Sequence, residues 1–207
     1  MGIDNTAFLV GFATSLGLIV AIGAQNAYVL RQGVRREYVV AVVAVCALAD
    51  VLLITAGVAG LGAPLRDHPG AVEAARYAGS AFLLTYGVLA ARRAMRRNAL
   101  VVDGEARVSL RVVVLTCLAF TFLNPHVYID TVLLLGSIAN QYGGGRQWWF
   151  GAGAIVASMT WFVALGWGAR LLSPLFARPA AWRVLDGAVA TIMMGLGCWL
   201  LLGGPAA

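Results

Sequence analysis

The chain of 207 residues is 61% hydrophobic and only 12% charged, with a mean hydropathy of +0.84. A soluble domain carries about 25% charged residues, so this composition excludes an ordinary soluble domain and indicates an integral membrane protein. The formal net charge of +6 fits basic loops that contact the anionic lipid of a bilayer. A nucleic-acid partner explains that charge poorly, and none is expected.

Six runs along the chain contain at most one charged residue each, and they predict six transmembrane helices. The runs cover residues 7–30, 38–65, 77–91, 112–140, 147–169 and 184–207. About 20 apolar residues span the hydrocarbon core as a helix. Five runs are long enough, and the third reaches that length if it begins near Ala71. The first run lacks a basic leader and is longer than the apolar region of a signal peptide, so we expect it to remain in the membrane.

The arginines predict the orientation of the chain, because basic residues favour cytoplasmic loops. Twelve of the fifteen arginines fall around the loops that follow the first, third and fifth runs. These are Arg31, Arg35, Arg36, Arg92, Arg93, Arg96, Arg97, Arg107, Arg111, Arg170, Arg178 and Arg183. The other side has Arg66, Arg76 and Arg146. Both termini are therefore expected outside the cytoplasm.

The fourth run is interrupted near its centre by Asn124, Pro125, His126 and Asp130. Pro125 has no N–H, so the carbonyl of Thr121 loses its helical partner. An Asn at the N-cap with Pro at the next position is also a favoured helix start. These residues predict a helix broken near its middle, which a membrane tolerates only where the break lines a cavity or is buried in protein. A carboxylate within a span is a candidate functional group.

A weak internal repeat relates a first half, about residues 5–97, to a second half, about residues 107–204. The matched positions are Tyr28 with Tyr128, Asp50 with Thr160, Pro64 with Pro174, Gly79 with Gly187, and Gly87 with Gly195. Because each half contains three spans, the halves insert with opposite topology, as in many secondary transporters. The first half has its own break at residues 23–26, where we expect Asn26 to cap a half-helix as Asn124 does. The predicted fold is an all-α integral membrane protein with six transmembrane helices in two inverted three-helix repeats, forming one transporter domain over residues 1–207.

Three segments resemble the signatures of the LysE family of basic amino acid exporters. They are GAQNAYVLRQGVRR at 23–36, ADVLLI at 49–54 and FLNPHVYIDT at 122–131. The third segment is closest to the arginine-exporter branch, whereas Ala24 matches the sequence motif of the lysine exporters. The choice between lysine and arginine therefore stays open. The resemblance covers essentially the whole chain. It implies export of L-lysine and L-arginine across the bacterial cytoplasmic membrane, and His126 replaces the lysine typical of threonine and homoserine exporters.

The chemistry of a basic amino acid fits the candidate residues. Half-helix N-termini suit its carboxylate, free carbonyls suit its α-ammonium, and Asp50 and Asp130 suit a cation or a competing proton. His126 and Asp130 share a helical face and could relay a proton. The residues predicted to bind substrate are Gln25, Asn26, Asp50, Asn124, His126, Tyr128, Asp130 and Trp161; those predicted for proton coupling are Asp50 and Asp130; the predicted helix breaks lie at Gly23 and Pro125.

An inside-negative potential opposes export of a cation by about 2.3 kcal/mol per charge per 100 mV. A compensating positive charge must therefore move inward, and proton antiport with alternating access is the predicted mechanism. No cofactor, metal or catalytic residue is expected.

Structural roles compete with these functional ones. The carboxylates can satisfy backbone groups at the breaks, and Tyr28, Tyr128, Trp161 and Trp167 can pack in the core. Asp186, near Arg183, is predicted to anchor the span at the cytoplasmic end. The residues predicted at the membrane interface are Trp148, Trp149 and Trp199, and those predicted as small core residues are Cys46, Cys117 and Cys198.

Other function classes lack their expected residues. A channel or metal-ion transporter would need a Cys, His and Asp cluster in the spans, which hold a single histidine. A membrane enzyme or thiol-disulfide carrier would need a Ser, His and Asp set or a CxxC pair, and neither occurs. Export of neutral amino acids remains the alternative, disfavoured by two intramembrane carboxylates. Gly195 and Gly197 allow close helix contacts, so a homo-oligomer stays open.

Overall fold

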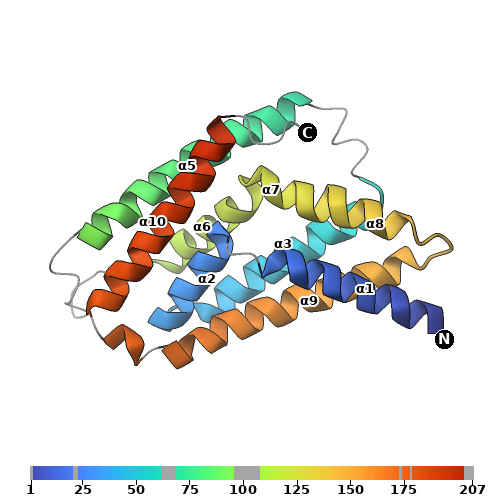
Figure 1. Ribbon diagram of the computed structural model, residues 1–207, viewed down its shortest axis with the longest axis horizontal. Helices are drawn as coiled ribbons and strands as arrows, with labels where there is room; N and C mark the ends of the chain where they lie inside the picture. The colour runs from blue at the N-terminus through green and yellow to red at the C-terminus, as the bar shows by residue number, and fades with distance from the viewer. Residues whose placement is uncertain are drawn as a thin grey trace.

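The computed structural model describes residues 2–20, 23–61, 69–95, 108–172, 174–177 and 179–202. Every regular element in those residues is a helix (Figure 1), which confirms the all-helical prediction for this part of the chain. Some positions used in the predictions lie outside the described residues, namely Pro64, Arg66, Arg96, Arg97, Arg107 and Arg178.

The longer helices carry the bulk of the fold. They are α1 (Gly2–Ile19), α2 (Ala24–Arg35), α3 (Val39–Val58), α5 (Pro69–Met95), α6 (Leu110–Phe122), α9 (Gln147–Gly168) and α10 (Pro179–Leu201). The shorter ones are α7 (Pro125–Tyr128), a π-helix (Ile129–Leu135), α8 (Gly136–Asn140) and two 3-10 turns, Ala169–Leu172 and Leu175–Ala177.

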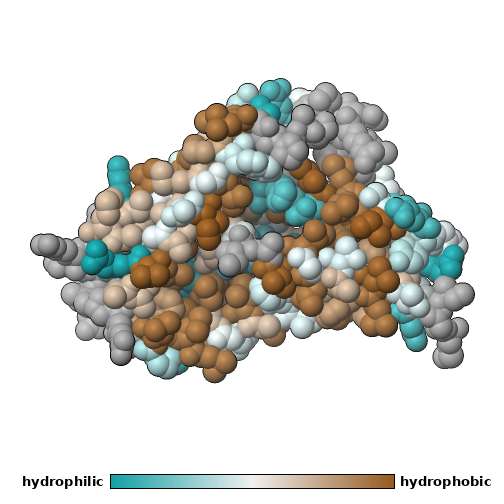
Figure 2. Space-filling model, viewed as in Figure 1, coloured by the Kyte–Doolittle hydropathy of each residue, from teal (hydrophilic) through white to brown (hydrophobic). Residues whose placement is uncertain are grey.

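Three described segments are long and apolar enough to cross a membrane, namely Val39–Val58, Gln147–Leu172 and Ala180–Leu201. The number rises to five if each of two bent helix pairs forms one span. Leu48 and Leu52 on α3 are 61% and 65% exposed, while Asp50 between them is buried. Apolar surface also covers much of the face in Figure 2. Exposed apolar side chains of this kind suit contact with lipid, and the protein is a multi-pass membrane protein.

The third predicted span is a helix, but it stands apart from the other five in polarity. It corresponds to α5, which is 27 residues long and does not belong to the apolar segments counted above. Glu73 and Arg76 lie in its first half, and Arg92 and Arg93 lie in its last turn. The described residues thus contain up to five apolar spans, and the arrangement of six spans stays a prediction.

Both predicted helix breaks occur in the structure. Segments Asp4–Ile19 and Ala24–Arg35 meet at 81°, and segments Leu110–Phe122 and His126–Asn140 meet at 62°. The second break lies where Asn124 and Pro125 predict it. The first begins earlier than predicted, because α1 ends at Ile19 and Gly23 is the N-cap of α2.

Glycines let α1 and α9 approach closely. A side chain at Gly11 would overlap the backbone of Phe150, and one at Gly153 would overlap the backbone of Phe8. The Ser15 hydroxyl donates to the carbonyl oxygen of Ala154 across the same contact, at 3.1 Å. A second glycine contact joins Gly57 of α3 to Gly136 of α8. These contacts fix α1, α3 and α9 as one packed group, to which the π-helix and α8 attach.

Helices α5 and α10 form an antiparallel pair that packs mainly on itself. The Ser80 hydroxyl donates to the carbonyl of Gly197 at 2.6 Å, and Arg183 donates to the carbonyl of Ala94 at 3.2 Å. In Figure 1 the pair lies along one side of the molecule. Aromatic contacts join it to the other helices, because Tyr86 packs against Tyr28 and Phe120 with ring centroids 6.2 and 4.9 Å away.

A buried ion cluster also joins this pair to α2, and it bears on two predictions. Arg31, predicted in a loop, lies within α2 and is 8% exposed. Its guanidinium binds Asp186 Oδ1 of α10 at 2.6 Å, and Arg93 of α5 binds the same oxygen at 3.3 Å. Asp186 is therefore a buried partner of Arg31 and Arg93. Asp186 was predicted to anchor the span near Arg183, but its ion-pair partners are these two arginines, because Arg183 donates to a backbone carbonyl.

Candidate functional site

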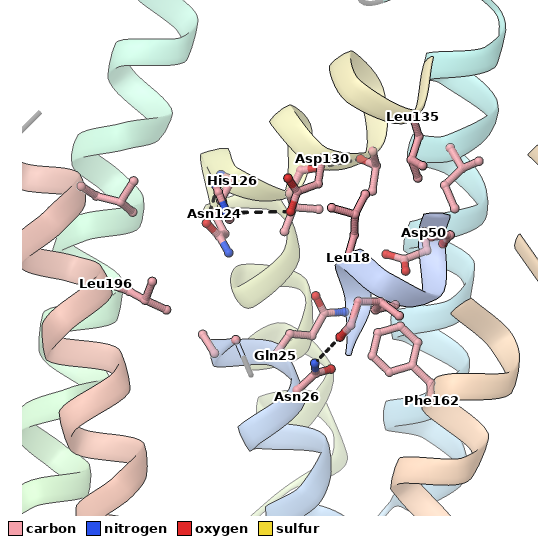
Figure 3. Close-up of a pocket in the computed structure, with 18 of the residues that line it drawn as sticks. Leu18, Gln25, Asn26, Asp50, Asn124, His126, Asp130, Leu135, Phe162 and Leu196 are labelled. Atoms are coloured by element: carbon pink, nitrogen blue, oxygen red, sulfur yellow. Dashed lines mark hydrogen bonds and ion pairs between the residues drawn. The ribbon is translucent and has the colours of Figure 1, made fainter. Parts of the chain in front are cut away.

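A cavity of about 240 Å³ lies between the α5–α10 pair and the remaining helices, beside both helix breaks (Figure 3). Elements far apart in the chain contribute its walls. The lining residues are Ser15, Leu18, Ile19, Gly23, Ala24, Gln25, Asn26, Asp50, Ile54, Asn124, His126, Val127, Asp130, Thr131, Leu135, Phe162, Leu196, Trp199 and Leu200. Most of the lining is apolar, with a few convergent polar groups, as in small-molecule binding sites.

The break between α6 and α7 is held by polar side chains at and near the cavity wall. Asn124 Oδ1 accepts a hydrogen bond from the backbone N–H of His126 at 3.2 Å, so Asn124 caps α7 as predicted. The Tyr128 hydroxyl donates to the carbonyl of Phe122 at 3.0 Å, which satisfies a carbonyl at the end of α6. Tyr128 therefore stabilises the break, and it is not part of the cavity lining.

His126 and Asp130 lie together on the cavity wall. The distance from His126 Nε2 to Asp130 Oδ2 is 3.9 Å, and the two side chains are 49% and 29% exposed. The placement on one helical face is confirmed. Trp199 of α10 meets the His126 ring edge-on, with ring centroids 5.7 Å apart. Trp199 also lines the cavity, and its interfacial position stays a prediction.

Asn26 holds the first break together in a way that differs from the prediction. Gly23, which has no side chain to act as a cap, is the N-cap of α2 with an extended backbone. Asn26 Nδ2 instead donates to the carbonyl of Ile19, the last residue of α1, at 2.6 Å. Its Oδ1 accepts from Trp161 Nε1 at 3.2 Å. Asn26 thus ties the two half-helices to α9, and Trp161 supports it from behind the cavity lining.

Asp50 is the most deeply placed charged group of the cavity, at 4% exposure. The Ser158 hydroxyl of α9 donates to its Oδ2 at 2.6 Å. Within the described ranges no cationic side chain pairs with it. A buried carboxylate without a counter-ion is costly, so Asp50 favours either a proton or a cation supplied by a ligand.

Gln25 adds a donor to the same cavity. It lies in the first turn of α2, where backbone N–H groups have no helical partner. Its Nε2 atom is buried and has no hydrogen-bond partner among the described residues. A buried donor without an acceptor is also unfavourable, so a ligand oxygen would stabilise this end of the cavity.

The structure therefore brings six predicted binding residues to one cavity and leaves two outside it. Gln25, Asn26, Asp50, Asn124, His126 and Asp130 line the cavity, whereas Tyr128 and Trp161 support it through hydrogen bonds. The helix-break residue Gly23 also lines it. Tyr28, left open between substrate contact and packing, is a core residue at 6% exposure.

Ser158 and Trp199 are site residues that the sequence reasoning missed. The offset of 108 that relates Gly79 to Gly187 also relates Asp50 to Ser158, so the repeat carried a signal for Ser158. For Trp199 no signal existed, because its position near the chain end equally fits an interface. Among the cysteines, Cys46 and Cys117 are buried as predicted, whereas Cys198 is exposed. The described part of the chain contains no cluster of three or more potential metal ligands.

Comparisons with known proteins agree with this architecture. A family model described as LysE type translocator matches residues 16–204. A provisionally named amino-acid transporter of Mycobacterium tuberculosis is 52% identical over 189 residues, covering 91% of this chain and 94% of that protein. The arginine exporter ArgO of Serratia proteamaculans is 41% identical, with 91% and 93% covered. The lysine exporter LysE of Corynebacterium diphtheriae is 38% identical, with 90% and 94% covered. No solved structure gives a significant match.

Proposed function

Since this chain belongs to the LysE translocator family, we propose that it exports basic L-amino acids, L-lysine and L-arginine, across the bacterial cytoplasmic membrane. The observation that carries the proposal is Asp50, a buried carboxylate that lines the cavity and has no cationic partner in the described residues. A cationic substrate supplies the missing charge, whereas threonine or homoserine would leave it unpaired. The names of the lysine and arginine exporters similar to this chain point the same way.

The proposed mechanism is proton antiport with alternating access. A carboxylate that takes a proton on the outside releases a cation, and it binds the next cation when it faces the inside. Asp50 and Asp130 are the proposed coupling groups, because both line the cavity. Two broken helices that meet at this cavity suit a site between two inverted repeats of a secondary transporter. The proposal includes six spans in a single domain, with both termini outside the cytoplasm.

Transport by the purified full chain in liposomes tests the function. We expect counterflow of labelled arginine and lysine and little counterflow of threonine. With an imposed pH gradient, arginine efflux should accelerate, and the Asp50→Asn, Asp130→Asn double variant should lose that acceleration. Counterflow of threonine in preference to both basic amino acids would replace the substrate assignment. Unchanged proton-driven efflux in the double variant would reject coupling through these carboxylates.

A further inference from the structure

We propose that the two carboxylates of the cavity bind different parts of one substrate. Asp50 binds the cationic end of the substrate side chain, and Asp130 together with Gln25 binds its α-amino acid group. The assignment rests on the proposed export of basic amino acids and makes these three residues the specificity determinants of the site.

The exposure of the lining residues indicates the orientation of the substrate within the cavity. Asp50 is 4% exposed, whereas the side chains of Asp130 and His126 are 29% and 49% exposed. The cavity therefore has a deep end at Asp50 and an open end at His126 and Asp130. Figure 3 shows Asp50 well apart from His126 and Asp130. A lysine or arginine that enters from the open end reaches the deep end with its side chain first.

The walls near the deep end suit the methylene chain of a basic amino acid. In Figure 3, Leu18 and Phe162 flank the Asp50 carboxylate. Ile54 also lines the cavity, and it lies one helical turn beyond Asp50 on α3. Phe162 and Ile54 are each 1% exposed. Apolar walls followed by a carboxylate match the order of groups along the substrate side chain, since methylenes precede the cation.

The charges at the deep end favour a cation. The one hydrogen bond recorded for Asp50 in the described part of the chain comes from Ser158, a neutral donor that leaves the negative charge uncompensated. A side chain without charge would bury this carboxylate unpaired. Sites of this kind reject a ligand that lacks the matching group more strongly than apolar pockets do.

Other lining residues offer partners for the α-ammonium and the α-carboxylate of the substrate. Asp130 faces the cavity beside His126 and can accept from an α-ammonium. Gln25 lines the cavity from the first turn of α2 (Figure 3), and its buried Nε2, which has no partner among the described residues, can donate to the α-carboxylate at that helix N-terminus. At the open end the Trp199 ring packs edge-on against His126. All three charged groups of a free basic amino acid then have a partner of suitable chemistry.

Arginine analogues that each lack one of these groups test the assignment. Citrulline lacks the side-chain charge, Nα-acetylarginine lacks the α-ammonium, and agmatine lacks the carboxylate. Competition with labelled arginine is measured in liposomes for the wild-type chain, Asp50→Asn, Asp130→Asn and Gln25→Leu. Asp4→Asn is the matched control, because it removes a carboxylate in the first turn of α1, outside the cavity lining.

Each variant should lose the ability to distinguish arginine from one of the three analogues. We expect Asp50→Asn to narrow the preference for arginine over citrulline by about tenfold or more and to keep the rejection of Nα-acetylarginine. Asp130→Asn should narrow the preference for arginine over Nα-acetylarginine and keep the preference over citrulline. Gln25→Leu should narrow only the preference for arginine over agmatine. For a variant that folds but does not transport, the ligand-induced rise in melting temperature of the purified protein gives the same comparison. The control should match the wild type.

Two results would overturn the assignment while leaving the proposed function intact. In the first, the wild type transports arginine but the citrulline effect follows Asp130 and the Nα-acetylarginine effect follows Asp50. In the second, each variant weakens all analogues equally, which would mean that the carboxylates act only on folding or coupling. A wild type that transports neither arginine nor lysine would instead reject the proposed function itself.

Discussion

Asp50 and Asp186 are both buried aspartates inside a helical membrane protein, at 4% and 5% exposure, yet their surroundings differ. Asp186 binds two arginines from two other helices, whereas Asp50 receives one hydrogen bond from a serine. An ion cluster with its counter-ions in place stabilises the packing of the helices that carry it. A carboxylate that lacks a counter-ion in a cavity is available to a ligand. The same residue type therefore has a structural position on α10, and on α3 it has the position for which we propose a functional role.

At the residue scale, we predict that Asp186→Asn destabilises the folded protein by about 3–5 kcal/mol, because it leaves the buried guanidinium of Arg31 and the partly buried one of Arg93 without their carboxylate. Arg31→Gln should also destabilise, and the double variant should lose less than the sum of the two single losses. Denaturant or thermal unfolding in detergent measures all three. Strictly additive losses would show that Arg31 and Asp186 do not stabilise each other in the folded state.

At the element scale, backbone approach decides which helices form one packed group. Gly11 and Gly17 both lie on α1, but only Gly11 meets another helix, at the backbone of Phe150 in α9. A methyl at Gly17 would find nothing within 4 Å.

The two helix breaks are also properties of single elements and their direct contacts. Pro125 and its Asn124 cap set the second break locally, whereas the first depends on Asn26 and its contacts with Ile19 and Trp161.

We predict opposite effects for the same substitution at these two glycines. Gly11→Ala should destabilise the protein by about 1–3 kcal/mol, since α1 and α9 must separate to admit the methyl group. Gly17→Ala should be neutral or stabilise by up to about 1 kcal/mol, because alanine favours a helix over glycine. Melting temperatures in detergent compare them directly. Equal melting temperatures would contradict the close contact of α1 with α9.

At the scale of the whole molecule, two groups of helices meet at the cavity. Helices α1, α3 and α9 pack together, and α5 packs mainly on α10. In Figure 1 the N-terminus and the α8–α9 turn lie at one end of the molecule, and the α2–α3 turn lies toward the other. The contacts of Arg93 with Asp186 and of Arg183 with Ala94 place the basic ends of α5 and α10 together. The orientation of the chain in the membrane stays a prediction from the loop arginines.

We predict that single cysteines at Asn5 and at Gly143, in a chain otherwise free of thiols, react with an impermeant reagent from outside the cell. Cysteines at Glu37 and at Gly104 should react only from the cytoplasmic side; Gly104 lies outside the described residues. The expectation follows from the positive-inside rule. Labelling of intact cells and of inverted vesicles gives the result. Asn5 and Glu37 on the same side would contradict a span formed by α1 and α2.

The sequence by itself determined the properties that depend on neighbouring residues. The apolar runs predicted the helices, and Pro125 with Asn124 predicted a break, because both act on the local backbone. The spacing of His126 and Asp130 placed them on one face. The tertiary structure decided the properties that depend on distant partners. Asn26 could cap α2 or bind Ile19, Arg31 could lie in a loop or pair with Asp186, 155 residues away, and Trp199 could face lipid or His126. Those choices were settled by which helices pack together, and the local sequence contains no information about the partner that a side chain meets across a cavity.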